Sequence, residues 1–227
     1  MQYVVQPGSV PLIVTARLRY RIGKRLLDIG VAGLALILLA PVFAACALAV
    51  WRSSPGPIIF RQQRVGLRGR AFTFLKFRSM YHRADSAPHR EYVTAFIKGE
   101  AARQDDGGKE VYKLIGDARI TPVGHWLRRT SLDELPQFWS VLRGDMSLVG
   151  PRPPIPYEVE HYRPDQLGRL AVKPGITGLW QISGRSSTTF AEMVELDIEY
   201  IRHQSFWFDV AILLRTIPAV LSTRGAR

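Results

Sequence analysis

The longest apolar run of the chain lies near its N-terminus. Residues Ile29–Trp51 form 23 consecutive positions without a charged side chain. At about 1.5 Å of rise per residue, a helix of this length matches a bilayer core of roughly 30 Å. A cleaved signal peptide or a buried soluble helix fits less well, because the run is long and begins only after 28 residues. We therefore predict a membrane helix at residues 21–52, after a flexible arm at residues 1–20.

A proline at the centre of this run, and basic residues on both sides, change the expected path of the helix. The flanking cations are Arg17, Arg19, Arg21, Lys24 and Arg25 before the run and Arg52, Arg61, Arg64, Arg68 and Arg70 after it. Because the positive-inside rule keeps both flanks in the cytoplasm, one straight crossing does not satisfy them. Pro41 breaks the helix into halves of about 12 residues, each too short to span. The pattern favours a re-entrant helix broken at Pro41, with both chain termini cytoplasmic; a kinked crossing helix remains the alternative.

Shorter patterns fill the segment that follows. The β-prone runs "PIIF" and "AFTFLKF" are separated by a basic segment containing glycine, which predicts a hairpin over residues 57–77. Residues 82–116 are polar and indicate a mobile insert or lid. Within residues 126–142, apolar side chains recur at spacings of three and four, which predicts a helix; they are Leu132, Leu135, Phe138, Trp139 and Leu142.

The C-terminal part reads as a glycine-rich loop at 172–185, then a helix in "FAEMVELDIEYI". The aromatic residues Phe206, Trp207 and Phe208 fit either a membrane interface or a packed core. The predicted fold class is therefore mainly α with small β elements (α+β). Residues 53–227 would form a cytoplasmic, membrane-associated catalytic domain with interfacial amphipathic helices.

Composition adds a preference for anionic partners. The chain has 31 Lys and Arg against 19 Asp and Glu, a formal net charge of +12. Such a balance suits nucleic acid, acidic lipid or a phosphorylated substrate. Neither an RNP-like nor a helix-turn-helix signature is present, so we expect no nucleic-acid partner. The single cysteine, Cys46, forms no disulfide within one chain, which fits a reducing, cytoplasmic-facing environment.

Two adjacent acids, Asp133 and Glu134, stand in "TSLDELPQFW". Ser131 and Glu134 match the S-x-x-E capping box, which would place both acids in a first helical turn. A cap accounts for Glu134 but not for Asp133, nor for Arg128 just upstream. A carboxylate near arginines and a helix N-terminus stays ionised, and it can attack phosphorus or bind Mg²⁺.

Further cations stand beside turn residues elsewhere in the chain. They are Lys76 and Arg78 in "KFRSM", Arg152 in "GPRP" and Arg185 in "SGR". Arginine suits bidentate phosphate contacts, so together these residues indicate a phosphate-handling site, although each alone reads as a surface ion pair. Asp197 is either a second metal or network carboxylate or an exposed helix residue. The five histidines are scattered and do not indicate zinc.

The long motifs carry a resemblance. "KFRSM", "RRTSLDELPQFWSVLRGDMSLVGPRP", "KPGITGLWQISGR" and "ELDIEYI" follow the proline-broken apolar run in this order. From about Arg21 to Leu221 the chain resembles the bacterial sugar transferase family, the monotopic phosphoglycosyl transferases. It looks most like the exopolysaccharide-initiating members that load a hexose phosphate. Ala40 is a departure, because many smaller members have serine before the breaking proline.

The resemblance implies a reaction at the cytoplasmic face of the bacterial inner membrane. A UDP-sugar would give its sugar-1-phosphate to polyprenyl (undecaprenyl) phosphate, with release of UMP. By resemblance, Asp133 would be the nucleophile that forms a phosphosugar-aspartate, and Glu134 would support Mg²⁺ and the catalytic network. Arg128, Arg152 and Arg185 would bind phosphate, with Lys76 and Arg78 as weaker phosphate ligands. Asp197 would be a metal or network carboxylate, and Pro41 would break the membrane helix.

Two other classes of function compete. A non-enzymatic, membrane-anchored anion- or lipid-binding protein would use the same basic residues without turnover. A glycoside hydrolase is disfavoured. Its two carboxyl groups flank the glycosidic bond at a separation of about 5 Å or more, and adjacent acids in one helical turn point in different directions. The sequence leaves open the sugar (galactose, glucose or another), the polyprenol length, the polysaccharide and the oligomeric state, for which a homodimer is compatible.

Overall fold

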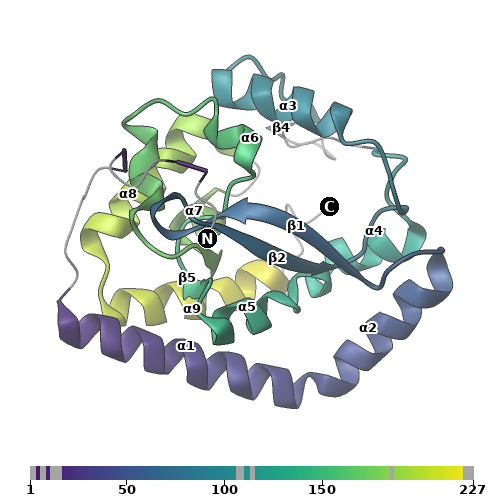
Figure 1. The fold of residues 1–227 in the computed structure, drawn as a ribbon, viewed down its shortest axis with the longest axis horizontal. Helices are drawn as coiled ribbons and strands as arrows, with labels where there is room; N and C mark the ends of the chain where they lie inside the picture. Colours follow the sequence, from purple (N-terminus) through teal and green to yellow (C-terminus); the bar gives the residue numbers. More distant parts are fainter. Residues whose placement is uncertain are drawn as a thin grey trace.

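The fold is a helical domain resting on a long, bent N-terminal helix (Figure 1). The structure is a computed structural model and describes residues 4–5, 9–10, 17–105, 110–112, 116–184 and 187–221. The described part is mostly helical, with three two-stranded sheets. The predicted α+β class is therefore confirmed.

The N-terminal helix is broken where the sequence predicted a break. Helix α1 (Leu18–Leu38) is followed after Leu39 by α2 (Ala40–Ser53), and the two are bent by 63°. Pro41 lies in the first turn of α2, where its missing N–H costs no helical hydrogen bond. Among the described residues no single helix is long and apolar enough to cross a membrane, but this bent pair meets the length and composition together. Helix α1 begins at Leu18, so the upstream cations from Arg19 onward lie inside it.

The inner faces of α1 and α2 pack on two different cores. Ala32 of α1 joins a core that includes Val141, Leu148, Ile201 and Ile212. Cys46 and Val50 of α2 join a second core with Phe77 and Leu127. The bent helix is thus packed against the domain through both of its halves.

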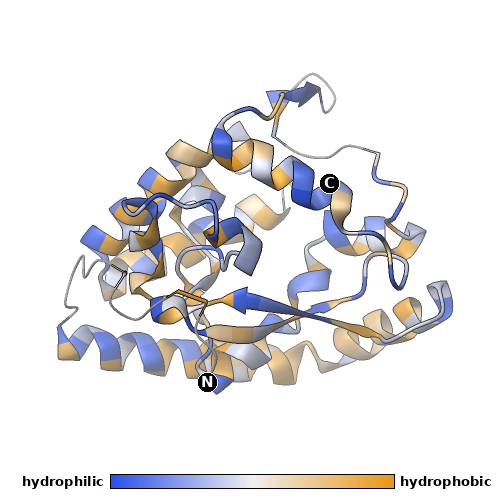
Figure 2. Cartoon of the chain, turned by 45° about the horizontal axis from the view of Figure 1, so that its top comes forward, coloured by the Kyte–Doolittle hydropathy of each residue, from blue (hydrophilic) through white to orange (hydrophobic). Residues whose placement is uncertain are grey.

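The outer faces remain apolar and uncovered, as the orange stretches along α1 and α2 illustrate (Figure 2). Together with three exposed side chains of α9 (Phe206–Leu221), we call them the exposed apolar surface. Its members are Leu18, Ile22, Leu26, Ile29, Leu34, Ile37, Leu48 and Trp51 on α1 and α2, and Trp207, Leu214 and Ile217 on α9. Trp207 is 76% exposed, whereas the neighbouring Phe208 ring packs 6.0 Å from that of Tyr200. Core packing is therefore confirmed for Phe208, and a membrane interface stays a prediction for Trp207. So many large exposed apolar side chains favour a surface that meets a membrane or a partner.

A hairpin follows α2, as predicted. Strands β1 (Ile59–Val65) and β2 (Ala71–Phe77) pair antiparallel on either side of the short η1 turn (Leu67–Gly69), with Ile59 opposite Phe77. Phe77 is buried in the core. The preceding residue of β2, Lys76, points to the opposite face of the hairpin and is partly exposed.

The polar segment 82–116 contains regular structure. Helix α3 (Ala87–Lys98) precedes the short antiparallel strands β3 (Gln104–Asp105) and β4 (Glu110–Val111). The ring of Phe96 in α3 meets that of Phe190 at a centroid distance of 5.9 Å. In Figure 1, α3 lies at the edge of the molecule opposite α1. The mobility of this segment stays a prediction.

The single helix expected within 126–142 is wrong. Helix α4 (Pro122–Arg129), the 3₁₀ turn η2 (Leu132–Glu134) and α5 (Gln137–Arg143) occupy this region. The chain turns because Ser131 adopts a left-handed conformation with φ of 57°. Pro136, at the start of α5, also supplies no N–H for a continuous helix.

The domain is completed by β5 and the elements that follow it in the chain. They are β5 (Ser147–Val149), α6 (Pro156–Val159), η3 (Gln166–Ala171), β6 (Gly175–Thr177), α7 (Leu179–Ser183), α8 (Phe190–His203) and α9 (Phe206–Leu221). Strands β5 and β6 pair in parallel, and a Cβ on Gly175 would lie 2.1 Å from the Gly150 nitrogen, so only glycine permits this approach. The segment predicted as a loop at 172–185 thus holds a strand and a short helix.

Candidate active site

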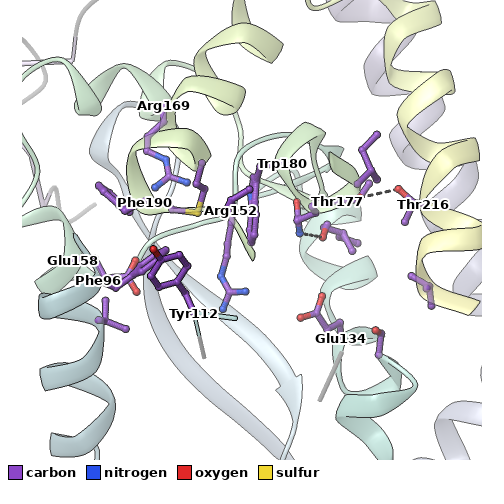
Figure 3. Close-up of a pocket in the computed structure, with 18 of the residues that line it drawn as sticks. Phe96, Tyr112, Glu134, Arg152, Glu158, Arg169, Thr177, Trp180, Phe190 and Thr216 are labelled. Carbon is purple, nitrogen blue, oxygen red and sulfur yellow. Dashed lines mark hydrogen bonds between the residues drawn. The ribbon is translucent and has the colours of Figure 1, made fainter. Parts of the chain in front are cut away.

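A cavity of about 600 Å³ opens beside the acidic turn η2. Its lining side chains come from α3, η2, α5, β6, α7, α8 and α9, and Glu134 and Arg152 stand near its middle (Figure 3). Glu134 is a lining residue, whereas Asp133 is not and is only 5% exposed. The cavity therefore meets the acidic pair through Glu134.

Lys76 joins the two acids. Its Nζ lies 2.7 Å from Oε1 of Glu134 and 3.5 Å from Oδ2 of Asp133. The predicted capping box is absent, because the Ser131 side chain forms no cap hydrogen bond and the Glu134 carboxylate is turned to Lys76. The alternative that Glu134 serves only as a helix cap is thus wrong.

The environment separates the acid strengths of the pair. Burial raises the pKa of Asp133 above its ordinary range, and the nearby Lys76 ammonium only partly offsets this. Burial also acts on Glu134, but Lys76, with help from Arg152 and Arg64, outweighs it and lowers the pKa of that carboxyl. The two neighbours therefore differ in basicity, and the more basic one is Asp133.

Two predicted phosphate ligands lie at this site. Arg128 donates from Nε to Oγ of Ser79 at 2.9 Å, and its charge acts on Asp133. Arg152 lines the cavity, is exposed, and forms no hydrogen bond or ion pair with any residue that the structure describes. Its guanidinium remains available for an anion. Arg185 lies outside the described residues.

Arg78 has a different task from the one predicted. Its guanidinium donates to the carbonyl oxygens of Pro57 at 2.8 Å and Val50 at 3.2 Å, and to that of Ser54. The residue is 4% exposed. The prediction of a phosphate contact is wrong for Arg78, because the side chain is buried and both of its terminal nitrogens already donate to backbone carbonyls.

Asp197 is not brought to the acidic pair. Its carboxylate accepts a hydrogen bond from Arg169, and the side chains are 1% and 2% exposed. Arg169 lines the cavity and also donates to the Tyr162 hydroxyl at 3.0 Å. Asp197 therefore orients Arg169, as the network carboxylate would, whereas the alternative of an exposed helix residue is wrong.

Two contributors were missed by the sequence reasoning. His89 lines the cavity, and its Nδ1 lies 2.8 Å from the Tyr157 hydroxyl. Burial lowers its pKa to about 4, and nearby arginines, Arg152 first among them, act in the same direction. Arg64 is buried and donates to the Pro153 carbonyl at 2.6 Å, which fixes the loop carrying Arg152. Neither residue has a local sequence signal, because both act through distant neighbours.

The acidic pair fits a magnesium ion. Mg²⁺ in proteins usually takes one or two carboxylates and completes its shell with water and substrate phosphates. Asp133 and Glu134 supply two such carboxylates, and the Lys76 ammonium lies within ion-pair distance of both. Within the described ranges no group of three or more His, Cys, Asp or Glu side chains converges on a site. The predicted set of Asp133, Glu134 and Asp197 is therefore reduced to the pair.

The chain is similar to several known sugar transferases and exopolysaccharide proteins. The chain is 47% identical over 207 residues to the galactosyl transferase CpsE of Streptococcus agalactiae, covering 91% of this chain and 44% of that protein. It is 40% identical over 205 residues to the exopolysaccharide production protein ExoY of Sinorhizobium fredii, covering 90% and 88%. It is 46% identical over 206 residues to the UDP-glucose:undecaprenyl-phosphate glucose-1-phosphate transferase of Escherichia coli, covering 87% and 40%. The chain thus spans less than half the length of several relatives that it matches.

A family model described as bacterial sugar transferase matches residues 19–223, which is nearly all of the described structure. The acidic pair, Lys76 and Arg152 all lie inside this match. The chain belongs to the bacterial sugar transferase family.

Proposed function

We propose that this protein transfers a hexose-1-phosphate from a UDP-sugar to undecaprenyl or another polyprenyl phosphate, as the first step of exopolysaccharide or other glycoconjugate synthesis. The relatives named for galactose or glucose phosphate transfer to undecaprenyl phosphate support this assignment. The observation that carries it is the Asp133–Glu134 pair, linked by Lys76 and opening through Glu134 on a cavity where Arg152 pairs with none of the described residues.

In the proposed reaction a carboxylate oxygen of Asp133 attacks the phosphorus that bears the sugar. The bond from that phosphorus to the bridging oxygen breaks, and UMP leaves with the electron pair. A phosphate oxygen of the polyprenyl phosphate then attacks the same phosphorus and releases the Asp133 carboxylate. The product is polyprenyl-diphosphate-sugar, and atoms and charge balance over the two steps.

The chain's own residues supply charge and position. Arg152 and Lys76 neutralise phosphate oxygens, and Arg128 keeps positive charge beside Asp133. The raised pKa of Asp133 makes its ionised form a stronger nucleophile, while Lys76 favours that ionised form. Mg²⁺, held by Glu134 and Asp133, would neutralise diphosphate charge when bound.

We also propose that the exposed apolar surface lies in the cytoplasmic leaflet of the inner membrane. The bend between α1 and α2, with basic residues flanking both ends of the pair, supports re-entry with both termini in the cytoplasm. Burial of apolar area contributes about 25 cal/mol per Å², and each nearby cation adds about 1 kcal/mol at an anionic surface.

The test is UMP release by the nanodisc-held full chain with Mg²⁺, polyprenyl phosphate and a panel of UDP-sugars. Asp133→Asn, Glu134→Gln and the exposed-site control Glu160→Gln are compared in parallel. We expect lipid-dependent UMP from one donor, its loss in Asp133→Asn, and unchanged turnover in the control.

Turnover that survives Asp133→Asn but not Glu134→Gln would move the nucleophile to the acid that lines the cavity. Anion or lipid binding without UMP from any donor would favour the non-enzymatic alternative.

A further inference from the structure

The cavity has two chemically different ends (Figure 3). One end is aromatic, with Phe96 of α3, Tyr112 directly after β4, and Phe190 of α8. The other end is largely aliphatic and is formed where β6 and α7 meet α9; its side chains are Ile176, Thr177, Ile182, Thr216 and Val220. Glu134, Arg152 and Trp180 stand between the two ends (Figure 3).

The aliphatic end adjoins the exposed apolar surface. Thr216 and Val220 face the cavity from α9, while Leu214 and Ile217 of the same helix are 62% and 57% exposed. One helix therefore separates the cavity from an uncovered apolar face. The link from β6 to α9 at this end includes a hydrogen bond between the hydroxyls of Thr177 and Thr216, at 2.8 Å.

The aromatic end lies away from that surface. Its wall includes α3, which is at the opposite edge of the molecule from α1 (Figure 1). A nucleotide donor arrives from water and can stack its base on aromatic rings. A polyprenyl phosphate keeps its hydrocarbon chain in the bilayer, so only a route through apolar side chains avoids exposing that chain to water.

We propose that the polyprenyl phosphate enters through the α9 end of the cavity. Its phosphate would lie near Arg152 and Lys76, beside Glu134, and its first isoprene units against Ile182, Thr216 and Val220. This inference rests on the proposed function and adds to it the side from which the acceptor arrives, with the donor occupying the aromatic end.

The test compares Val220→Trp, which fills the aliphatic end, with the matched control Ile217→Trp on the outer face of the same helix. Initial rates are measured on the nanodisc-held full chain with each substrate varied in turn. For Val220→Trp we expect kcat/KM for polyprenyl phosphate to fall at least about tenfold, and kcat/KM for the UDP-sugar to stay within about twofold. Ile217→Trp should change neither.

Equal losses for both substrates, or no loss for either, would overturn the proposal. A wild-type chain that releases no UMP with any donor would instead count against the proposed function, so the two failures are distinguishable.

A second variant covers the case in which the tryptophan disturbs folding. Val220→Cys changes volume little, and the native Cys46 is buried at 1% exposure, so a maleimide should report the new thiol. Polyprenyl phosphate should slow this labelling at least about fivefold, whereas UDP-sugar and neutral polyprenol should not. Labelling that polyprenyl phosphate leaves unchanged would place the acceptor elsewhere.

Discussion

The Lys76 ammonium lies 2.7 Å from the Glu134 carboxylate, and this contact joins the β-hairpin to the acidic turn η2. The same nitrogen is 3.5 Å from Asp133, so one cation serves both acids. A single strand residue is therefore the cation nearest to both acids.

Lys76→Met should lower kcat/KM at neutral pH by about tenfold or more, because a cation beside the reacting phosphates is lost. The pKa of Asp133 is already raised by burial, and Lys76 opposes that rise. Its removal raises this pKa further, so a larger fraction of Asp133 is protonated and inactive at low pH. The acidic limb of the pH–rate profile should move to higher pH. The control is Lys98→Met at the exposed end of α3, and an unmoved limb in Lys76→Met would contradict this account of the pair.

Chelation of divalent cations should reduce sugar-phosphate transfer by about 100-fold or more. The pair of carboxylates at Asp133 and Glu134 fits Mg²⁺, and no arginine that the structure describes forms an ion pair with either of them. UMP release is measured after EDTA treatment and again after excess Mg²⁺ is added back. Full turnover in EDTA would show that Lys76 and the arginines suffice without a metal ion.

The structure separates two arginines that the sequence grouped together. Arg152→Met should lower kcat/KM for the UDP-sugar by about 100-fold with little change in thermal stability, because the side chain is exposed and unpaired within the described structure. Arg78→Met should instead destabilise the fold by about 3 kcal/mol, because the carbonyl oxygens of Val50 and Pro57 lose their hydrogen-bond donor. Thermal unfolding and initial rates of both variants are measured in nanodiscs. A stable Arg78→Met variant with impaired donor binding would restore the original prediction for Arg78.

Asp209 holds the first helix to the domain. Its buried carboxylate accepts from Lys24 at 2.8 Å, from the Tyr20 hydroxyl at 3.0 Å and from that of Tyr200 at 2.8 Å. Asp209→Asn should cost about 3 kcal/mol of unfolding free energy, because Lys24 loses its partner in a largely dry site. Asp165→Asn is the matched control, since its ion pair with Arg163 is exposed and should contribute at most about 1 kcal/mol. Equal effects of the two substitutions on thermal unfolding would contradict the role given to Asp209.

Local patterns sufficed for much of the fold. The apolar run with its central proline predicted the broken helix, because proline acts on the turn in which it stands. Alternating β-prone runs predicted the β1–β2 hairpin, and the α8 helix followed from its spacing. The long motifs also placed Asp133, Glu134, Lys76, Arg128 and Arg152 in one candidate site by resemblance, and the structure brings them together.

The tertiary structure decided what depends on distant partners. Ser131 takes a left-handed turn, so the expected continuous helix became three elements and Glu134 turned from a cap to Lys76. Arg78 and Asp197 carry the same charges as site residues, but burial beside carbonyl groups and Arg169 gave them structural tasks. A sequence states which charges exist, whereas their availability depends on which groups from other segments lie within hydrogen-bonding distance, and only the folded chain fixes that.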